Sequence, residues 1–362
     1  MLEDSKKISI RQAAFLFITF TFTPSISLVP IYTSIKAKQG AWLAPTGVIG
    51  VLILLAFIWQ GLYKKYNDSS LMDIYSDIVG SFIGKILVII HLFWILFLTA
   101  FYLRTFANRL VESIYPNVSM NIFTMLILIV IVYTLRFGLI SLARFNEVVL
   151  PSLALVFYIL VILMLPNMKF KFLTPITYRD IIPIFQGGLG IISILSYFTF
   201  LFIVGEKINN KEKIVKSAIQ ISIFMLLALT AIIGITIGVF SYKIVQRIQS
   251  PFLIAVKQIS LFNTLEKIES AVLPFWALSD FVLISFFMIC TLHLLKYLFN
   301  LSSTKPFINI YGILLYILSN LLANNIFEIQ SFSHDFVLPV NIAFGFVLPL
   351  LIFIIGKIRK KV

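Results

Sequence analysis

The stretch Phe185–Leu195, FQGGLGIISIL, places three glycines and a glutamine inside a long apolar run. Each glycine weakens a helix by roughly 1 kcal/mol relative to alanine, so the cluster needs a physical reason. Three reasons are available: a turn that cradles phosphate, a face that packs closely against another helix, or a break in a membrane helix. The first fails because no strand precedes the glycines and no basic residue lies close to them.

The composition of the chain is that of a membrane protein. The sequence is 60% hydrophobic and 12% charged, with a mean hydropathy of +1.03. Apolar runs of about 20 residues, the length that crosses ~30 Å of hydrocarbon, recur along the chain with short polar connections. We therefore expect an all-α integral membrane protein in which residues 1–362 form a single transmembrane domain.

Hydropathy and turn signals predict ten transmembrane helices. Ser250 followed by Pro251 predicts a short interfacial helix over about 250–262. Basic residues concentrate in one set of connections and in both tails, which predicts cytoplasmic termini. The beginning of the chain has no small-residue cleavage site and is read as the lead into the first span. The predicted spans are 9–35, 41–63, 82–110, 121–140, 146–166, 180–205, 213–241, 267–298, 307–323 and 337–357.

Two predicted spans contain interruptions at corresponding positions. Thr23-Pro24-Ser25 falls within the first span, and Gln186-Gly187-Gly188-Leu189-Gly190 falls within the sixth. Ten spans divide into repeats of about 9–166 and 180–357, so the pattern predicts a 5+5 inverted repeat with discontinuous first and sixth helices. Non-helical backbone at membrane depth must line a cavity. Close packing remains the alternative for Gly187, Gly188 and Gly190.

Acidic residues inside the eighth span are candidates for ion or ligand contacts, because ionisable groups are costly in a membrane. Asp280 lies near mid-depth and Glu269 near the outer end, on nearly the same helical face. Either could bind a cation or a ligand amine. The alternatives are that Asp280 pairs with a basic residue such as Arg104 or accepts hydroxyl hydrogen bonds, and that Glu269 is a solvated helix end.

Several function classes find no support in the residues. The single cysteine, Cys290, cannot form an intramolecular disulfide, and the three histidines show no spacing for metal binding, so neither a metal site nor a cofactor is expected. No nucleophile–base pair suggests an enzyme. The net charge of +14 is explained by orientation in a membrane rather than by nucleic acid.

The segment Ser250–Phe281, SPFLIAVKQISLFNTLEKIESAVLPFWALSDF, resembles the signature of the spore germination permease family. These are the B subunits of nutrient germinant receptors, a branch of the amino acid–polyamine–organocation transporter superfamily. The chain length, the ten spans and the early KISIRQ motif match as well. The resemblance implies a protein of the inner spore membrane that binds a small nutrient, usually an amino acid, beside an A subunit and a C-subunit lipoprotein.

The resemblance also implies a ligand site between the first, third, sixth and eighth spans, at Thr23, Pro24, Ser25, Phe97, Tyr102, Gly190, Ser193, Leu195 and Ser285. The predicted helix breaks add Gly187 and Gly188, and the apolar pocket adds Ile191. Free amides of the half-helices would bind a carboxylate, and opposing carbonyls an ammonium group. Tyr102 would act as a lid or hydroxyl donor; its alternative is packing against lipid. Apolar lining favours a small or branched hydrophobic amino acid.

Two functions compete for this site. A receptor subunit would sense the nutrient and signal to partner proteins through a ligand-dependent shape. An amino acid symporter driven by protons or sodium would use Asp280 or hydroxyl groups for the ion. The two differ in flux, because only a symporter must alternate access and accumulate its ligand.

Overall fold

The computed structural model describes residues 7–113, 117–259, 268–322 and 326–362, and these form a helical bundle. The first half contains one short strand, eight α-helices and several 3₁₀ turns. The strand and α-helices are β1 (Ile8–Ser9), α1 (Ile10–Ser27), α2 (Val29–Ala37), α3 (Ala44–Val48), α4 (Gly50–Lys65), α5 (Leu71–Val79), α6 (Ser81–Ser113), α7 (Met120–Leu135) and α8 (Gly138–Met164). The 3₁₀ elements are η2 (Lys38–Leu43), η3 (Leu165–Asn167), η4 (Phe170–Phe172) and η5 (Tyr178–Asp180).

The second half mixes α-helices with 3₁₀ and π segments. Its elements up to the loop before the eighth predicted span are α9 (Ile181–Gly187), α10 (Leu189–Leu195), the 3₁₀ helix η6 (Ser196–Lys207), β2 (Ile208–Asn209), η7 (Lys211–Lys213), α11 (Ile214–Phe240), α12 (Tyr242–Val245) and α13 (Pro251–Val256). The remainder are α14 (Ile268–Leu298), α15 (Phe307–Leu322), α16 (Ile326–Phe332), the π-helix η8 (Ser333–Val337), α17 (Leu338–Ile342), the π-helix η9 (Ala343–Val347) and α18 (Leu348–Ile358).

Helices occupy all ten predicted ranges, which confirms the all-α membrane class. Seven helical stretches of the described residues are long and apolar enough to cross a membrane, and α7 and α15 are shorter apolar helices. The count of ten spans therefore stays a prediction. The interfacial helix is shorter than predicted, since α13 ends at Val256, and part of the predicted range lies outside the described residues.

The first span is interrupted, but four residues later than predicted. Thr23, Pro24 and Ser25 all lie inside α1, whereas the helix ends at Ser27 and α2 begins after Leu28. Pro24 and Pro30 each lack an N–H, so the carbonyls four residues earlier lose their helical donors. The α-helix is therefore interrupted between the two prolines, at Leu28, rather than at the first.

Helix α1 runs through the centre of the bundle and is buried along most of its length. It packs against α8, α11 and α14. Ser9 caps it, since the Ser9 hydroxyl accepts from the Gln12 amide and the Gln12 side chain accepts from Ser9 N–H. A parallel pairing of β1 with β2 ties this start to the end of the sixth span.

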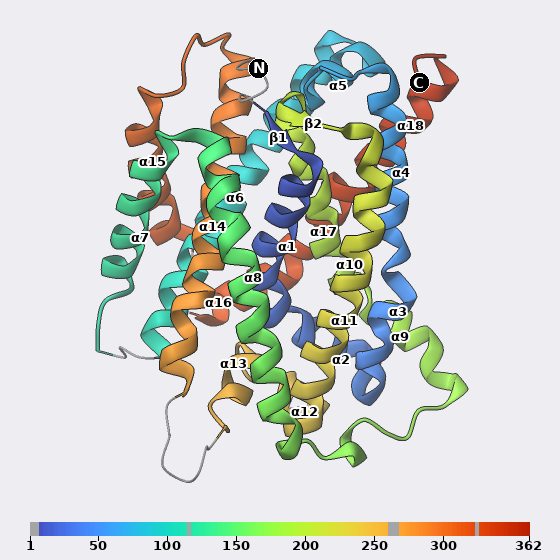
Figure 1. Cartoon of the computed structure of the whole chain (residues 1–362), viewed down its shortest axis with the longest axis vertical. Helices are drawn as coiled ribbons and strands as arrows, with labels where there is room; N and C mark the ends of the chain where they lie inside the picture. The colour runs from blue at the N-terminus through green and yellow to red at the C-terminus, as the bar shows by residue number, and fades with distance from the viewer. Residues whose placement is uncertain (1–6, 114–116, 260–267, 323–325) are drawn as a thin grey trace.

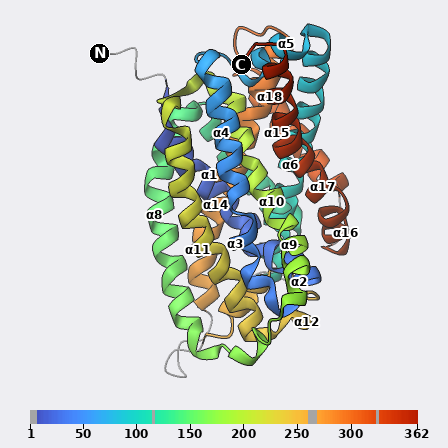
Figure 2. The ribbon, with the colours of Figure 1, turned by 90° about the vertical axis from the view of Figure 1, so that its right-hand side faces the viewer.

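The last helices cover one side of the bundle. Figure 2 shows α16, α17 and α18 on the side opposite to α8, and α18 packs against α4 and α5. Strand β1 and the end of α18 lie at the same end of the bundle in Figure 1. Both ends of the described chain therefore face the same side, as an even number of crossings requires.

Candidate functional site

The glycines of the sixth span allow close helix packing. Gly188 keeps helical dihedrals of φ −62° and ψ −17°, and its N–H donates to the carbonyls of Ile184 at 3.0 Å and Phe185 at 3.1 Å. A Cβ on Gly187 would lie 2.8 Å from the Thr33 carbonyl oxygen, and one on Gly190 would lie 2.5 Å from the Tyr32 Cβ. The Gly188 N–H is thus bonded within the sixth span, Gly187 and Gly190 approach α2, and Gly188 approaches Val48 of α3. The geometry supports the close-packing alternative, and a ligand role for Gly187, Gly188 and Gly190 stays a prediction.

The sixth span is irregular, but the larger change of geometry follows the glycines. The helix becomes 3₁₀ at Ser196, and Val204 has non-helical dihedrals of φ −102° and ψ 28°. A 3₁₀ helix winds more tightly, so its side chains are offset from those of α10. Tyr197 and Thr199 lie in this segment, which is buried throughout from Ser196 to Gly205.

A buried ion pair joins the third and eighth spans. Arg109 Nη1 of α6 donates to Asp280 Oδ2 of α14 at 2.5 Å, with only 5% and 1% of the two side chains exposed. The named alternative partner, Arg104, is wrong: its Nη1 donates instead to Asn121 and Asn320. Among the described residues, Asp280 Oδ1 and Arg109 Nε and Nη2 have no hydrogen-bond partner.

The first span meets this ion pair through hydroxyl groups. Thr23 Oγ1 donates to Ser279 Oγ, the neighbour of Asp280, at 3.1 Å, and Ser279 Oγ donates to the Thr19 carbonyl at 2.7 Å. Ser25 Oγ instead donates to the Thr21 carbonyl of its own helix at 2.7 Å. Thr23 is therefore the predicted residue of this group whose side chain reaches the polar centre.

A second polar cluster connects the third, sixth and last spans. The hydroxyls of Tyr102 and Tyr197 are 2.6 Å apart. Asn341 Nδ2 donates to Tyr197 Oη at 2.9 Å and Ser193 Oγ at 3.3 Å, and Trp94 Nε1 donates to Asn341 Oδ1 at 3.1 Å. Tyr102 is 1% exposed, so the alternative of packing against lipid is wrong.

Sequence reasoning missed Tyr197 and Asn341. Both are polar residues in apolar runs, and that signal was available. Tyr197 lies among several aromatic residues in the sequence, so its hydroxyl does not stand out as a polar group. Asn341 lies in a predicted span without a predicted helix break. Their partnership depends on how the last span packs against α10, which hydropathy does not encode.

The remaining predicted residues divide between the interior and the periphery. Ile191, Leu195 and Ser285 are buried, and Ser285 Oγ has no hydrogen-bond partner among the described residues. Phe97 instead stacks on Phe332 at 4.8 Å and lines a peripheral apolar groove between α6, α15 and α16. Glu269 is the second residue of α14, and its side chain lies outside what the structure describes.

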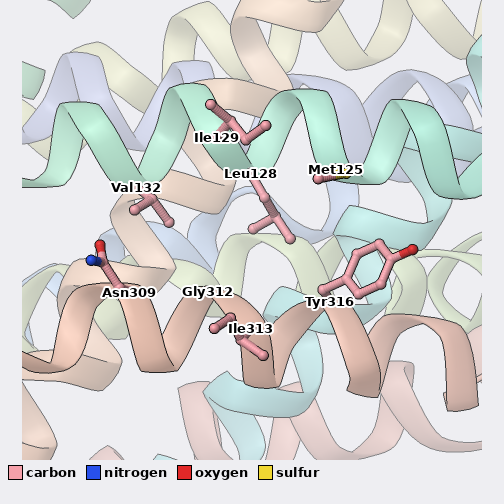
Figure 3. Close-up of a pocket in the computed structure, with 8 residues that line it drawn as sticks. All are labelled: Met125, Leu128, Ile129, Val132, Asn309, Gly312, Ile313 and Tyr316. Carbon is pink, nitrogen blue, oxygen red and sulfur yellow. The ribbon is translucent and has the colours of Figure 1, made fainter.

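A further apolar groove lies between α7 and α15, away from these polar clusters (Figure 3). None of its lining residues was predicted to bind ligand. They are Met125, Leu128, Ile129, Val132, Asn309, Gly312, Ile313 and Tyr316. We call this surface the α7–α15 groove.

The described residues contain no group of three or more His, Cys, Asp or Glu side chains that could hold a metal ion. The polar centre instead offers hydroxyls, a guanidinium group, a carboxylate and backbone carbonyls. Such a set can recognise a small charged or zwitterionic molecule.

The model of the family described as spore germination protein matches residues 7–327. The chain belongs to this family. Its relatives in Bacillus subtilis (strain 168) include spore germination protein KB, which is 22% identical over 99% of this chain and 96% of its own length. Putative spore germination protein YfkT of the same organism is 23% identical over 97% of this chain and 96% of its own length.

Two solved transporters share the fold of this germination-family chain. Mhp1, a nucleobase-cation-symport-1 family transporter in a closed conformation with bromovinylhydantoin bound, has a TM-score of 0.63 and 12% identity, covering 96% of this chain and 78% of Mhp1. MhsT in complex with L-phenylalanine has a TM-score of 0.59 and 14% identity, and the match covers 94% of this chain and 98% of MhsT. At these identities the comparison establishes the fold alone.

Proposed function

We propose that this protein is the membrane subunit of a spore nutrient germinant receptor, which binds a small apolar amino acid and signals through partner subunits. Membership of the spore germination family supports the biological role. The partners would be a receptor A subunit and a C-subunit lipoprotein, and the location the inner membrane of the spore with both termini cytoplasmic. The single observation that supports ligand binding is the buried Arg109–Asp280 pair with its unpartnered polar atoms.

The charges of this pair complement those of a free amino acid. A ligand carboxylate would accept hydrogen bonds from the unpartnered guanidinium nitrogens of Arg109, and a ligand ammonium group would donate to Asp280 Oδ1. The Phe20 carbonyl, which lacks a helical donor because of Pro24, would add an acceptor beside Thr23. This arrangement replaces the free amides that sequence reasoning placed at the glycines.

Apolar side chains surround the polar centre and favour an apolar ligand side chain. Phe20 stacks on Phe286 with ring centroids 5.0 Å apart, and the Phe287 ring lies 5.6 Å from that of Tyr197. Ile191 and Leu195 of α10 are fully buried on the sixth span. A charged ligand side chain would lose its hydration here without gaining a partner.

A proton- or sodium-coupled amino acid symporter is the second candidate, and the fold shared with Mhp1 and MhsT favours it. Asp280 and Thr23 would then hold the ion. The receptor is preferred because the family and its relatives carry germination names.

The two functions separate in one sample of purified protein. Ligand-dependent thermal stabilisation is measured in detergent with a panel of amino acids, and uptake of the same radiolabelled amino acids is measured in liposomes under a proton or sodium gradient. Stabilisation without uptake supports the receptor subunit. Gradient-driven accumulation that is lost in Asp280→Asn establishes the symporter instead, and absence of both signals refutes amino acid binding.

A further inference from the structure

The α7–α15 groove meets a second, basic cavity at the end of the bundle where β1 and the end of α18 lie. The groove encloses about 450 Å³ and the basic cavity about 380 Å³. Leu135 at the end of α7 and Arg136 directly after it line the basic cavity, and so do Lys305, just before α15, and Ile308 at its start. Helices α7 and α15 therefore border both surfaces, and α14 adds Lys296 to the basic cavity.

The two surfaces are continuous along one face of each helix. On α7 the lining residues recur at helical spacing from Met125 to Leu135, and on α15 from Tyr316 back to Ile308. Arg136 Nη2 donates to Asn309 Oδ1 at 3.3 Å where the groove and the cavity meet. At 1.5 Å per residue the α7 stripe is about 15 Å long, half of the ~30 Å hydrocarbon thickness and hence the depth of one leaflet.

The basic cavity has the charge of an anion site. Four cationic side chains line it, from Arg136, Lys207, Lys296 and Lys305, together with hydroxyls of the segment 302–304. Its described lining includes no carboxylate, and none of the ion pairs found among the described residues involves these lysines. The nearby Glu206 is already bound to His293, with 2.8 Å between the two side chains.

Two helix ends add to this positive potential. Helix α8 begins at Gly138 and α15 begins just after Lys305, so both direct N-terminal amides toward the same region. The partial positive charge of a helix N-terminus favours an anion and reinforces the four cations. The cavity thus combines four full positive charges and hydroxyl donors with two helix N-termini, and the full charges outweigh the partial negative charge of the α7 and α14 C-termini that also lie there.

The groove, by contrast, is apolar and open to the surroundings of the bundle. Ile129 is 56% exposed and Ile313 is 63% exposed, on opposite sides of the groove. Gly312 lets the helices approach, since a Cβ there would lie 2.7 Å from a Val132 methyl group. In a membrane this surface contacts hydrocarbon, not water.

We propose that the basic cavity and the α7–α15 groove together bind one anionic phospholipid. The headgroup phosphate lies among Arg136, Lys207, Lys296 and Lys305, and one acyl chain lies along the groove. Basic pockets between membrane helices are established sites for anionic headgroups. A free phosphate would use the cavity alone and leave the apolar groove without a role.

The test uses the full chain, delipidated in a neutral detergent, and measures binding of phosphatidylglycerol and phosphatidylcholine with identical acyl chains by native mass spectrometry. Glycerol phosphate and inorganic phosphate serve as soluble probes. We expect phosphatidylglycerol to bind more tightly than phosphatidylcholine. The double variant Lys296→Gln/Lys305→Gln should weaken phosphatidylglycerol binding by about fivefold per removed charge. The matched control, Lys64→Gln/Lys213→Gln, removes two exposed lysines outside the cavity and should leave binding unchanged.

A third variant tests the groove itself. Ile129→Trp fills the rim of the groove without altering the basic cavity, so it should weaken phosphatidylglycerol binding and leave glycerol phosphate binding unchanged. Equal binding of the two lipids would overturn the proposal, as would an equal loss in the control variant. If inorganic phosphate displaced bound phosphatidylglycerol as strongly as added lipid does, the cavity would be a site for a soluble anion, and the phospholipid proposal would be refuted.

Discussion

Removal of the Asp280 charge is the perturbation with the largest consequence calculable from this structure. In Asp280→Asn the guanidinium of Arg109, only 5% exposed, loses the carboxylate that lies 2.5 Å away. A buried charge left without its partner costs about 3–5 kcal/mol. We expect the free energy of unfolding in detergent micelles, measured by reversible denaturant titration, to fall by that amount.

A compensating double variant distinguishes this explanation from a simple packing defect. In Arg109→Met/Asp280→Leu both charges leave together, so most of the lost stability should return, because the desolvation cost disappears with them. The destabilisation of the double variant should therefore be much smaller than the sum of the destabilisations of the two single variants, which is a large coupling energy between the two sites. Asp280→Asn within 1 kcal/mol of the wild type would refute the reasoning, as would additive effects of the two single substitutions.

Three further predictions concern packing, the buried hydroxyls and pH. Gly190→Ala should lower the thermal melting temperature, because its new Cβ would lie 2.5 Å from the Tyr32 Cβ; an unchanged melting temperature would contradict close packing at this position. Tyr197→Phe removes a hydroxyl that joins two buried polar groups and should cost about 1–3 kcal/mol in the same denaturant titration; a cost near zero would mean that water replaces it. Hydrogen bonds from the Lys361 ammonium and, second, from the Tyr66 hydroxyl lower the pKa of the Asp77 carboxyl in the folded protein. The ionised Asp77 therefore stabilises the fold at pH values above the pKa that it has in the unfolded chain. This stabilisation is lost as the pH falls through the lower pKa of the folded state. The melting-temperature difference between wild type and Asp77→Asn should accordingly shrink below about pH 4, and a difference that grows there would reverse the assigned sign.

The candidate site was predicted in part. Thr23, Tyr102, Ser193 and Asp280 lie in the polar interior, since buried polar residues in apolar runs are recognisable from the sequence. Phe97 was placed at the ligand but faces the periphery, because an aromatic ring carries no sequence signal that separates a pocket from a lipid-facing surface. Helical periodicity fixes which residues share a face, but not the direction in which that face points.

By itself the sequence determined the membrane class, the helical ranges and the family resemblance, because hydropathy and local motifs are written along the chain. Only the tertiary structure decided that Gly187 and Gly190 pack against α2, that the first span is interrupted at Leu28, and that Asp280 pairs with Arg109 rather than Arg104. Asp280 and Arg109 are far apart in sequence and lie on different helices. Their pairing depends on the rotation and depth at which α6 and α14 pack, and these are set by the combined shape of all the helices.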